Sequence, residues 1–268
     1  MGVRVESGLA AIAVHAKQKW WGTMTTYPTF EPKRVYTQAF CTPDDIVLAE
    51  AVRGFVNKEI MPRRHDLEGG WHRDEKLALD TVNHLYRGLT ELGLAQLGVP
   101  EAYGGLSASP FARLIVSEEI SRGDIGLATM VSKIYWATSI MMAGRRTDLM
   151  QEFAPRIVTE PWTTAVCITE PDGGCNIEDP AFAFRTIRTV ARRDGDDYVI
   201  NGHKIWPGPG GQPDHFSGAD LKGHLGYWVV ASTDPALGPD GVGIFFVPPD
   251  AVGLGLSAPY QKMGMSWT

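Results

Sequence analysis

The sequence predicts an α+β fold, in which an N-terminal α-helical domain precedes a mostly antiparallel β-domain. Apolar residues recur at helical spacing through most of the first 160 residues. After Pro161, short runs rich in β-branched and aromatic residues alternate with Gly, Pro and Asp, which is typical of strands and their turns. We therefore expect an irregular N-terminal extension over residues 1–41, the α-helical domain over 42–160 and a β-barrel-like domain over 161–268.

The helical domain begins with a clear start signal. Thr42 can cap a helix, Pro43 suits the first helical position, and Asp45 lies three residues after the cap. We expect this helix to reach Ile60 and to end at Met61-Pro62. Further helices are expected over residues 75–92, 110–122, 125–143 and 148–159.

The second half of the chain carries strand signals and one unusual break. Strands are expected over residues 166–168, 182–192, 198–205, 227–231 and 242–247. Asp194-Gly195 predicts a hairpin between two of them. The stretch INGHKIWPGPGG, residues 200–211, begins as a strand and breaks after Trp206. Because proline restricts the backbone and glycine permits positive φ, we expect a sharp bend there.

Composition narrows the class of protein. Apolar residues make up 44% and charged residues 21% of the chain, as in soluble globular proteins. No apolar run approaches the ~20 residues of a membrane helix, so no membrane insertion is expected. A net charge of −6 and the lack of a basic stripe argue against binding to nucleic acid. Three cysteines without CxxC spacing favour a reducing, cytoplasmic location, and the histidines lack metal-ligand spacing.

Several ordered motifs resemble those of the acyl-CoA dehydrogenase family. AVCITEPDGGCN (165–176) is similar to that family's C-x-T-E-P-x-x-G-S-D, and INGHKIW (200–206) to its I-N-G-x-K-x-W-I-T-N-G. Three further segments also resemble motifs of the family and follow in the family's order: VRGFVNKEIMP, then LGVPEAYGGLS with SEEISRGD, and finally QKMGMSW. The resemblance implies FAD as cofactor and α,β-dehydrogenation of an acyl-CoA thioester. It also implies transfer of electrons to an electron-transfer flavoprotein and a homo- or hetero-oligomer.

The residue chemistry of the two motifs suits a flavin. A strand that ends at Thr169 offers a hydroxyl and amides to the pyrimidine edge, where reduction places negative charge. Trp206 can stack on the ring, and the turn Pro171–Gly174 allows close approach of a pyrophosphate. The expected cofactor-binding residues are Val166, Cys167, Ile168, Thr169, Gly174, Cys175, Trp206, Pro207 and Gly208.

Other roles follow from the resemblance and from departures from it. Cys175 and Thr233 match substrate-contacting serine positions of the family, although a thiol is a weaker hydrogen-bond donor than a hydroxyl. Gly208 stands where the family usually has a threonine that reaches flavin N5, and we expect its amide to substitute. The resemblance places the general base in a C-terminal four-helix domain beyond Thr268, so the catalytic residue is unknown and this chain alone is expected to be an incomplete enzyme.

Two rival hypotheses remain. In the first, the chain is a non-catalytic acyl-CoA dehydrogenase-like subunit or fragment that needs a partner chain to complete the active site. Alternatively, it is a structural αβ protein in which Trp206 is a core residue. Glu118 and Glu119 are not expected to act as a base, because they follow an apolar helical stripe away from the flavin motifs.

Overall fold

The computed structural model of the protein describes residues 39–67, 73–174, 187–208, 223–257, 260 and 262–265. The predicted extension lies outside these residues except for its last three positions. The chain divides into two compact units, Met1–Ile46 and Val47–Thr268. In the first unit the predicted cap is present: the Thr42 amide donates to Asp45 Oδ2 at 2.8 Å, and the Asp45 amide donates to Thr42 Oγ1 at 3.2 Å.

The first helix does not end where the sequence predicts. Helix α3 (Pro43–Phe55) continues through a π-helical turn (Val56–Ile60) and a 3-10 turn (Met61–Arg63) into α4 (Arg64–Leu67). The expected break at Pro62 is wrong, because a proline at this position costs no backbone hydrogen bond. Pro62 lies in the first turn of a new helical segment, where its missing N–H would have no partner in any case.

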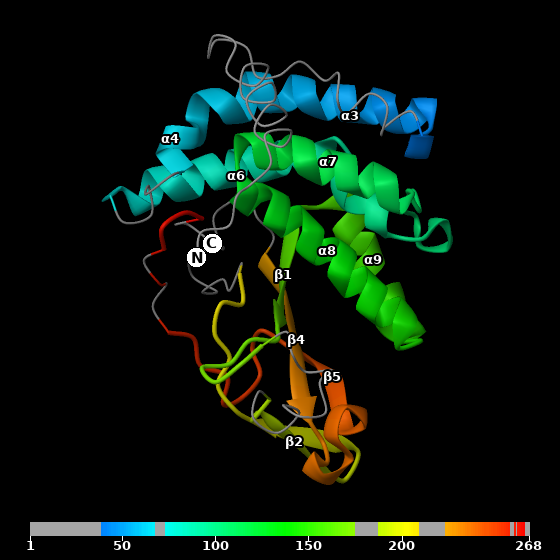
Figure 1. Cartoon of the computed structure of the whole chain (residues 1–268), viewed down its shortest axis with the longest axis vertical. Helices are drawn as coiled ribbons and strands as arrows, with labels where there is room; N and C mark the ends of the chain where they lie inside the picture. Colours follow the sequence, from blue (N-terminus) through cyan, green and yellow to red (C-terminus); the bar gives the residue numbers. More distant parts are fainter. Residues whose placement is uncertain are drawn as a thin grey trace, which may run out of the picture. The chain divides into compact units, whose positions relative to one another are not determined.

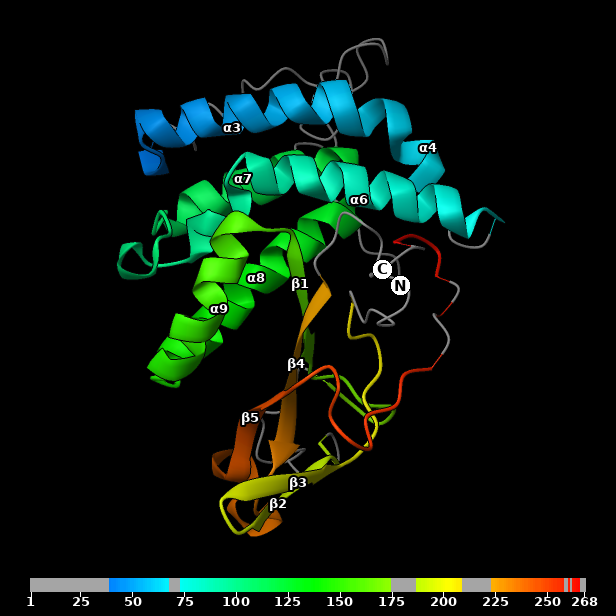
Figure 2. The same cartoon turned by 180° about the vertical axis from the view of Figure 1, so that it is seen from behind.

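The other helices agree with their predicted ranges to within one residue. They are α6 (Glu75–Glu91), α7 (Pro110–Gly123), α8 (Ile125–Ala143) and α9 (Thr147–Thr159) (Figures 1 and 2). Side-chain caps explain three of the starts, because Asp74, Ser109 and Asp124 each accept from an amide three residues ahead. These three start signals are therefore local, whereas α9 begins at Thr147 without a side-chain cap.

The second half forms one mixed sheet. Its strands are β1 (Trp162–Cys167), β2 (Val190–Asp194), β3 (Asp197–Asn201), β4 (Gly223–Ser232) and β5 (Val242–Val247). The β2–β3 hairpin turns at Gly195, as predicted, and β4–β5 is also antiparallel. β1 and β2 both pair parallel with β4, so the sheet is mixed, although most of its paired residues are antiparallel, as predicted. The long connection from β1 to β4 allows a parallel return that no local motif signals.

Alternate residues of β1 pack into different cores. Val166 joins Trp228 and side chains of α8 and α9 in one cluster, so this face of the sheet lies against the helices (Figure 1). Ala165 and Cys167 pack with Tyr227 in a separate cluster. The end of β1 is therefore fixed from both faces, and the segment that follows it starts from a rigid support.

The end of α7 packs closely against the π-helical turn, and this contact can be tested. A Cβ added at Gly123 would lie 2.7 Å from Ile60 Cγ2 and 2.9 Å from Val56 Cγ1, whereas one at Gly54 would meet nothing within 4 Å. We predict that Gly123→Ala lowers the free energy of unfolding by about 1–3 kcal/mol. Gly54→Ala, on an exposed helical position, should raise it by about 0.5–1 kcal/mol. Urea unfolding of both variants checks this, and equal effects would refute the close packing.

Candidate functional site

The segment that follows β1 is organised by a buried carboxylate. Glu170 and Gly173 exchange backbone hydrogen bonds of 2.7 and 3.2 Å, which close a tight turn. The Glu170 side chain is 4% exposed. Its carboxylate accepts from the amides of Arg188 at 2.7 Å and Thr189 at 3.0 Å, and from Lys204 Nζ at 2.7 Å. One side chain thus joins the turn to the start of β2 and to the segment that follows β3.

Lys204 strengthens the same junction. Its ammonium also donates to the Ile168 carbonyl at 2.9 Å, and the next amide, that of Ile205, donates to the Thr169 carbonyl at 2.9 Å. Nearby, a Cβ added at Gly202 would lie 2.2 Å from Thr189 Oγ1, so only glycine fits there. Residues 168–174, 188–189 and 202–205 are therefore fastened into one unit, which we call the Glu170 junction.

The surroundings of the pair favour the ionised carboxylate of Glu170 but not the ammonium of Lys204. Burial alone would raise the pKa of Glu170, but the hydrogen bonds from Lys204 and the two amides outweigh it and lower the pKa below its usual value. Burial lowers the pKa of Lys204, and the contact with Glu170 opposes part of that change. The carboxylate is thus ionised at neutral pH and fully hydrogen-bonded, as a buried charge must be.

Trp206 directly follows the Glu170 junction and has a strained backbone conformation. Its φ is 61°, in the left-handed region that a bulky residue rarely adopts. The side chain is 54% exposed, and its ring centroid lies 4.5 Å from that of Tyr260. The predicted bend is therefore present, and it begins at Trp206 itself. The Gly208 amide donates to the Trp206 carbonyl at 2.8 Å within the bend. That this amide substitutes for the family's threonine at flavin N5 stays a prediction.

A cavity of about 1520 Å³ lies beside this bend. Its lining includes four of the predicted cofactor-binding residues, namely Cys167, Trp206, Pro207 and Gly208. Lys133 of α8, Tyr260 and Lys262 line it as well, and burial lowers the pKa of both lysines. Burial raises the pKa of the Cys167 thiol to about 12, so this cysteine remains a neutral thiol and is unsuited to nucleophilic chemistry.

The other predicted site residues lie elsewhere or have other contacts. Val166 is buried against the helices, and Ile168 packs on the same cluster. Thr169 and Gly174 belong to the turn, where a Cβ on Gly174 would lie 3.3 Å from the threonine side chain. None of these four is among the described residues that line the cavity. Cys175 lies outside the described residues.

Thr233, the second predicted substrate contact, serves a local turn. Its hydroxyl donates to the Gly241 carbonyl at 2.9 Å, and its amide donates to the same oxygen at 2.8 Å. Thr233 is exposed and is not among the described residues that line the cavity. The structure therefore does not bring it together with Trp206.

Sequence analysis missed Glu170 and Lys204 as site residues. Both letters stand inside the quoted motifs, between the threonine and the tryptophan that we singled out. Two charged residues of opposite sign, one shortly after a predicted strand (166–168) and one within another (198–205), could have suggested a buried pair. The sequence alone could not show that residues 34 apart meet.

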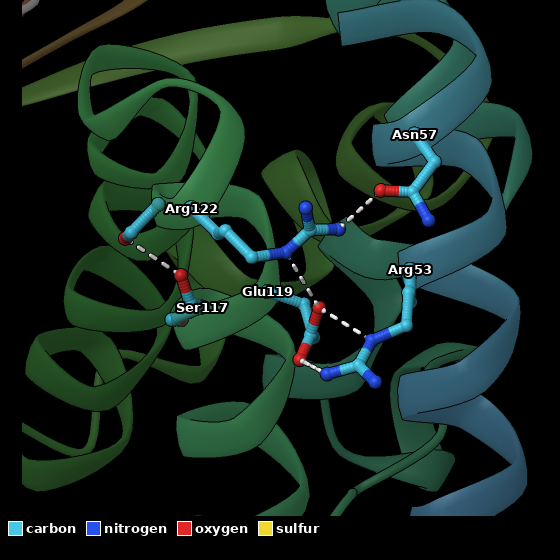
Figure 3. Close-up of polar contacts among 6 residues, drawn as sticks. Arg53, Asn57, Ser117, Glu119 and Arg122 are labelled. Atoms are coloured by element: carbon cyan, nitrogen blue, oxygen red, sulfur yellow. Dashed lines mark hydrogen bonds and ion pairs between the residues drawn. The ribbon is translucent and has the colours of Figure 1, made fainter. Parts of the chain in front are cut away.

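A second buried carboxylate has a different environment. Glu119 on α7 is 3% exposed, and Arg53 donates to both of its oxygens at 3.1 and 2.6 Å (Figure 3). Arg122 donates to Glu119 Oε2 at 3.3 Å and to Asn57 Oδ1 at 2.7 Å. This network fastens α7 to α3 and its π-helical turn. As expected, Glu119 is not placed to act as a base, because its oxygens are taken up by two guanidinium groups.

We predict that Glu119→Gln lowers the free energy of unfolding by about 2 kcal/mol, because it removes the charge from hydrogen bonds with two arginines. Glu118→Gln is the matched control, since Glu118 is exposed on the same helix. Thermal and urea unfolding measure the difference. If the two substitutions cost the same, the network does not stabilise the helical domain.

The lowered pKa of Glu170 gives a pH-dependent prediction. Stability from an ionised group with a depressed folded-state pKa is fully present above the unfolded value of ~4.3 and is lost as the pH falls through the folded value. We therefore expect Glu170→Gln to destabilise strongly at pH 7 and progressively less from pH 5 to pH 2. Urea unfolding of both proteins across this range checks it. A difference that is constant or grows in acid would contradict it.

Within the ranges given above, no three His, Cys, Asp or Glu side chains gather as metal ligands would. Among the helices of this part of the chain, none is long and apolar enough to cross a membrane.

A helical domain followed by a curled mixed sheet is the architecture of acyl-CoA dehydrogenase-like folds. The family model of the acyl-CoA dehydrogenase N-terminal domain matches residues 42–160, and that of the middle domain matches residues 165–268. The chain belongs to the acyl-CoA dehydrogenase family.

Individual relatives agree with this family. A (2S)-methylsuccinyl-CoA dehydrogenase of Cereibacter sphaeroides is 29% identical over 60% of this chain and 27% of its own length. The short/branched chain specific acyl-CoA dehydrogenase of Bos taurus mitochondria is 27% identical over 84% of this chain and 46% of its own. The structure of a Bacillus anthracis acyl-CoA dehydrogenase complexed with FAD superposes with a TM-score of 0.62 at 22% identity, covering 85% of this chain and 34% of that one. The chain thus spans less than half the length of these relatives.

Proposed function

We propose that this chain takes part in FAD-dependent α,β-dehydrogenation of an acyl-CoA thioester and that the electrons pass to an electron-transfer flavoprotein. The observation that carries the proposal is Trp206. A core tryptophan would be buried, yet this indole is 54% exposed, lines a large cavity and is held at a strained φ. Strained, exposed aromatic residues are characteristic of ligand sites.

The described residues fit a flavin. A flat, mostly apolar ring system needs a flat partner on its face and hydrogen-bond donors on its edge. The Trp206 indole supplies the face, and Pro207 and Gly208 allow close approach beside it. Thr169 uses its carbonyl in the contact with Ile205, and we propose that its hydroxyl and amide meet the pyrimidine edge. Cys167, Ile168 and Gly174 complete the proposed surface, with Val166 contributing main chain only. Cys175 remains a prediction.

The chemistry divides between cofactor and chain. Bound FAD would accept the β-hydrogen of the acyl group as hydride. The residues of this chain would hold the ring, orient it and exclude water from one of its faces. No carboxylate is assigned as the general base, because Glu119 and Glu170 are each committed to buried ion pairs. A cytoplasmic location and a homo- or hetero-oligomer belong to the same proposal.

Flavin absorbance and turnover test the proposal in two stages. The purified protein is incubated with FAD, freed of excess cofactor and scanned for the yellow flavin band. Anaerobic addition of short-chain and branched-chain acyl-CoA thioesters should then bleach the band once a partner chain or segment supplies the general base, and a dye acceptor should restore it. A bound flavin that no thioester bleaches would favour the non-catalytic subunit, which the engaged amide of Gly208 also suggests. A bound flavin with its yellow band would exclude the structural alternative.

We predict that Trp206→Ala weakens FAD binding about tenfold or more, since an aromatic stacking contact contributes about 0.5–1.5 kcal/mol beyond the area it buries. Its effect on the unfolding free energy should be small, because the side chain is half exposed. The matched control is Trp136→Ala, which removes a 49% exposed tryptophan from α8. Fluorescence titration with FAD and urea unfolding separate the two effects. Unfolding of the sheet with unchanged flavin affinity would show that Trp206 is a core residue.

A further inference from the structure

The Glu170 junction has a role that goes beyond stability. We infer that Glu170 and Lys204 are positioning residues for the cofactor: they hold Trp206 and the end of β1 in one preformed arrangement that faces the cavity. The inference rests on the proposed function for the identity of the ligand. Its basis is geometric, since one carboxylate and one ammonium contact the main chain on both sides of the proposed flavin-binding surface.

The geometry of the hydrogen bonds matters more in the Glu170–Lys204 pair than the electrostatic attraction between the two charges. A buried ion pair often adds little stability compared with apolar residues of the same volume, because desolvation offsets the attraction. Hydrogen bonds to named oxygens, in contrast, fix a register. Lys204 Nζ bridges the Glu170 carboxylate and the Ile168 carbonyl, so it sets the position of Ile205 along residues 168 and 169. The Ile205 amide then contacts the Thr169 carbonyl directly before the bend.

The conformation of Trp206 needs such a support. A bulky residue keeps a positive φ only where the surrounding structure determines it more strongly than the local backbone preference does. On one side Trp206 follows the contact of Ile205, and on the other its carbonyl accepts from Gly208. Without Lys204 the first anchor is weakened, and Trp206 can return to an ordinary φ. The indole would then no longer be presented at the cavity in a fixed orientation.

The test uses Lys204→Met, which keeps the length of the side chain and removes its charge, and Glu170→Gln as a second variant. Lys76→Met is the control for the substitution itself, because Lys76 forms an exposed ion pair with Asp80. Thr164→Val is the control for lost stability. It removes a buried hydroxyl that donates to the Gly226 carbonyl and accepts from Trp228 Nε1. Thr164 lies on β1, the strand that leads to the Glu170 junction, but it is not among the described residues that line the cavity.

Hydrogen-exchange mass spectrometry and titration with FAD are the two measurements. In Lys204→Met and Glu170→Gln, peptides covering residues 168–174 and 200–208 should exchange at least tenfold faster, while α8 keeps its protection. The dissociation constant for FAD should rise at least tenfold, and the visible circular dichroism of the bound flavin should change. Thr164→Val, although less stable, should keep both the affinity and the flavin spectrum.

Each outcome decides the inference. If Thr164→Val weakens FAD binding as much as Lys204→Met does, the pair contributes only stability and the inference fails. Unchanged exchange and affinity in both junction variants would also overturn it. If the unaltered protein binds no FAD, the proposed function fails instead. Hydrogen exchange then still decides whether the pair holds the Trp206 segment, because local deprotection supports the preformed arrangement and unchanged protection refutes it.

Discussion

The carboxylate of Glu170 is the contact on which the geometry of the candidate site depends. The sheet supplies β1 and the β2–β3 hairpin, but these strands do not pair with each other directly, since both lie along β4. The segments that leave them are joined by the Glu170 side chain, which accepts three hydrogen bonds from the start of β2 and from Lys204. A buried charge is tolerated here because each oxygen has a donor.

Glu119 and Glu170, two of the buried carboxylates among the described residues, illustrate how the same group serves different ends. Glu119 lies between two arginines and fastens helix to helix, far along the sequence from the flavin motifs. Glu170 accepts mainly from main-chain amides and one lysine, and it fastens irregular segments whose shape no regular hydrogen-bond ladder determines. Loss of the Glu119 carboxylate should therefore lower the free energy of unfolding. Loss of the Glu170 carboxylate should change the conformation of Trp206.

Much of the fold could be predicted because its signals are local. Asp74, Ser109 and Asp124 cap helices whose ranges follow from the sequence, and Gly195 marks the hairpin. Strand pairing could not be predicted, because the parallel contact of β1 with β4 depends on a connection of more than fifty residues. The π-helical turn Val56–Ile60, which precedes Pro62, packs against Gly123, and the sequence does not signal this tertiary contact.

The candidate site was predicted in part. The motifs pointed to Trp206 and to the bend after it, and the structure places Cys167, Trp206, Pro207 and Gly208 at one cavity. The sequence could not show that the Gly208 amide closes the bend, or that the Thr233 hydroxyl serves a turn with Gly241. Nor could it show that Glu170 and Lys204 meet. Each of these depends on where distant main-chain atoms lie, which motif spacing does not encode.

A crystal structure of the protein with FAD tests the central claim most directly. We expect the flavin ring to lie against the Trp206 indole, with its pyrimidine edge toward Thr169, and Trp206 to keep its positive φ. The contacts of Glu170 with Lys204 and with the amides of Arg188 and Thr189 should be the same as in the protein without cofactor. A ring bound away from Trp206, or a Glu170 junction that forms only when FAD is present, would contradict the account.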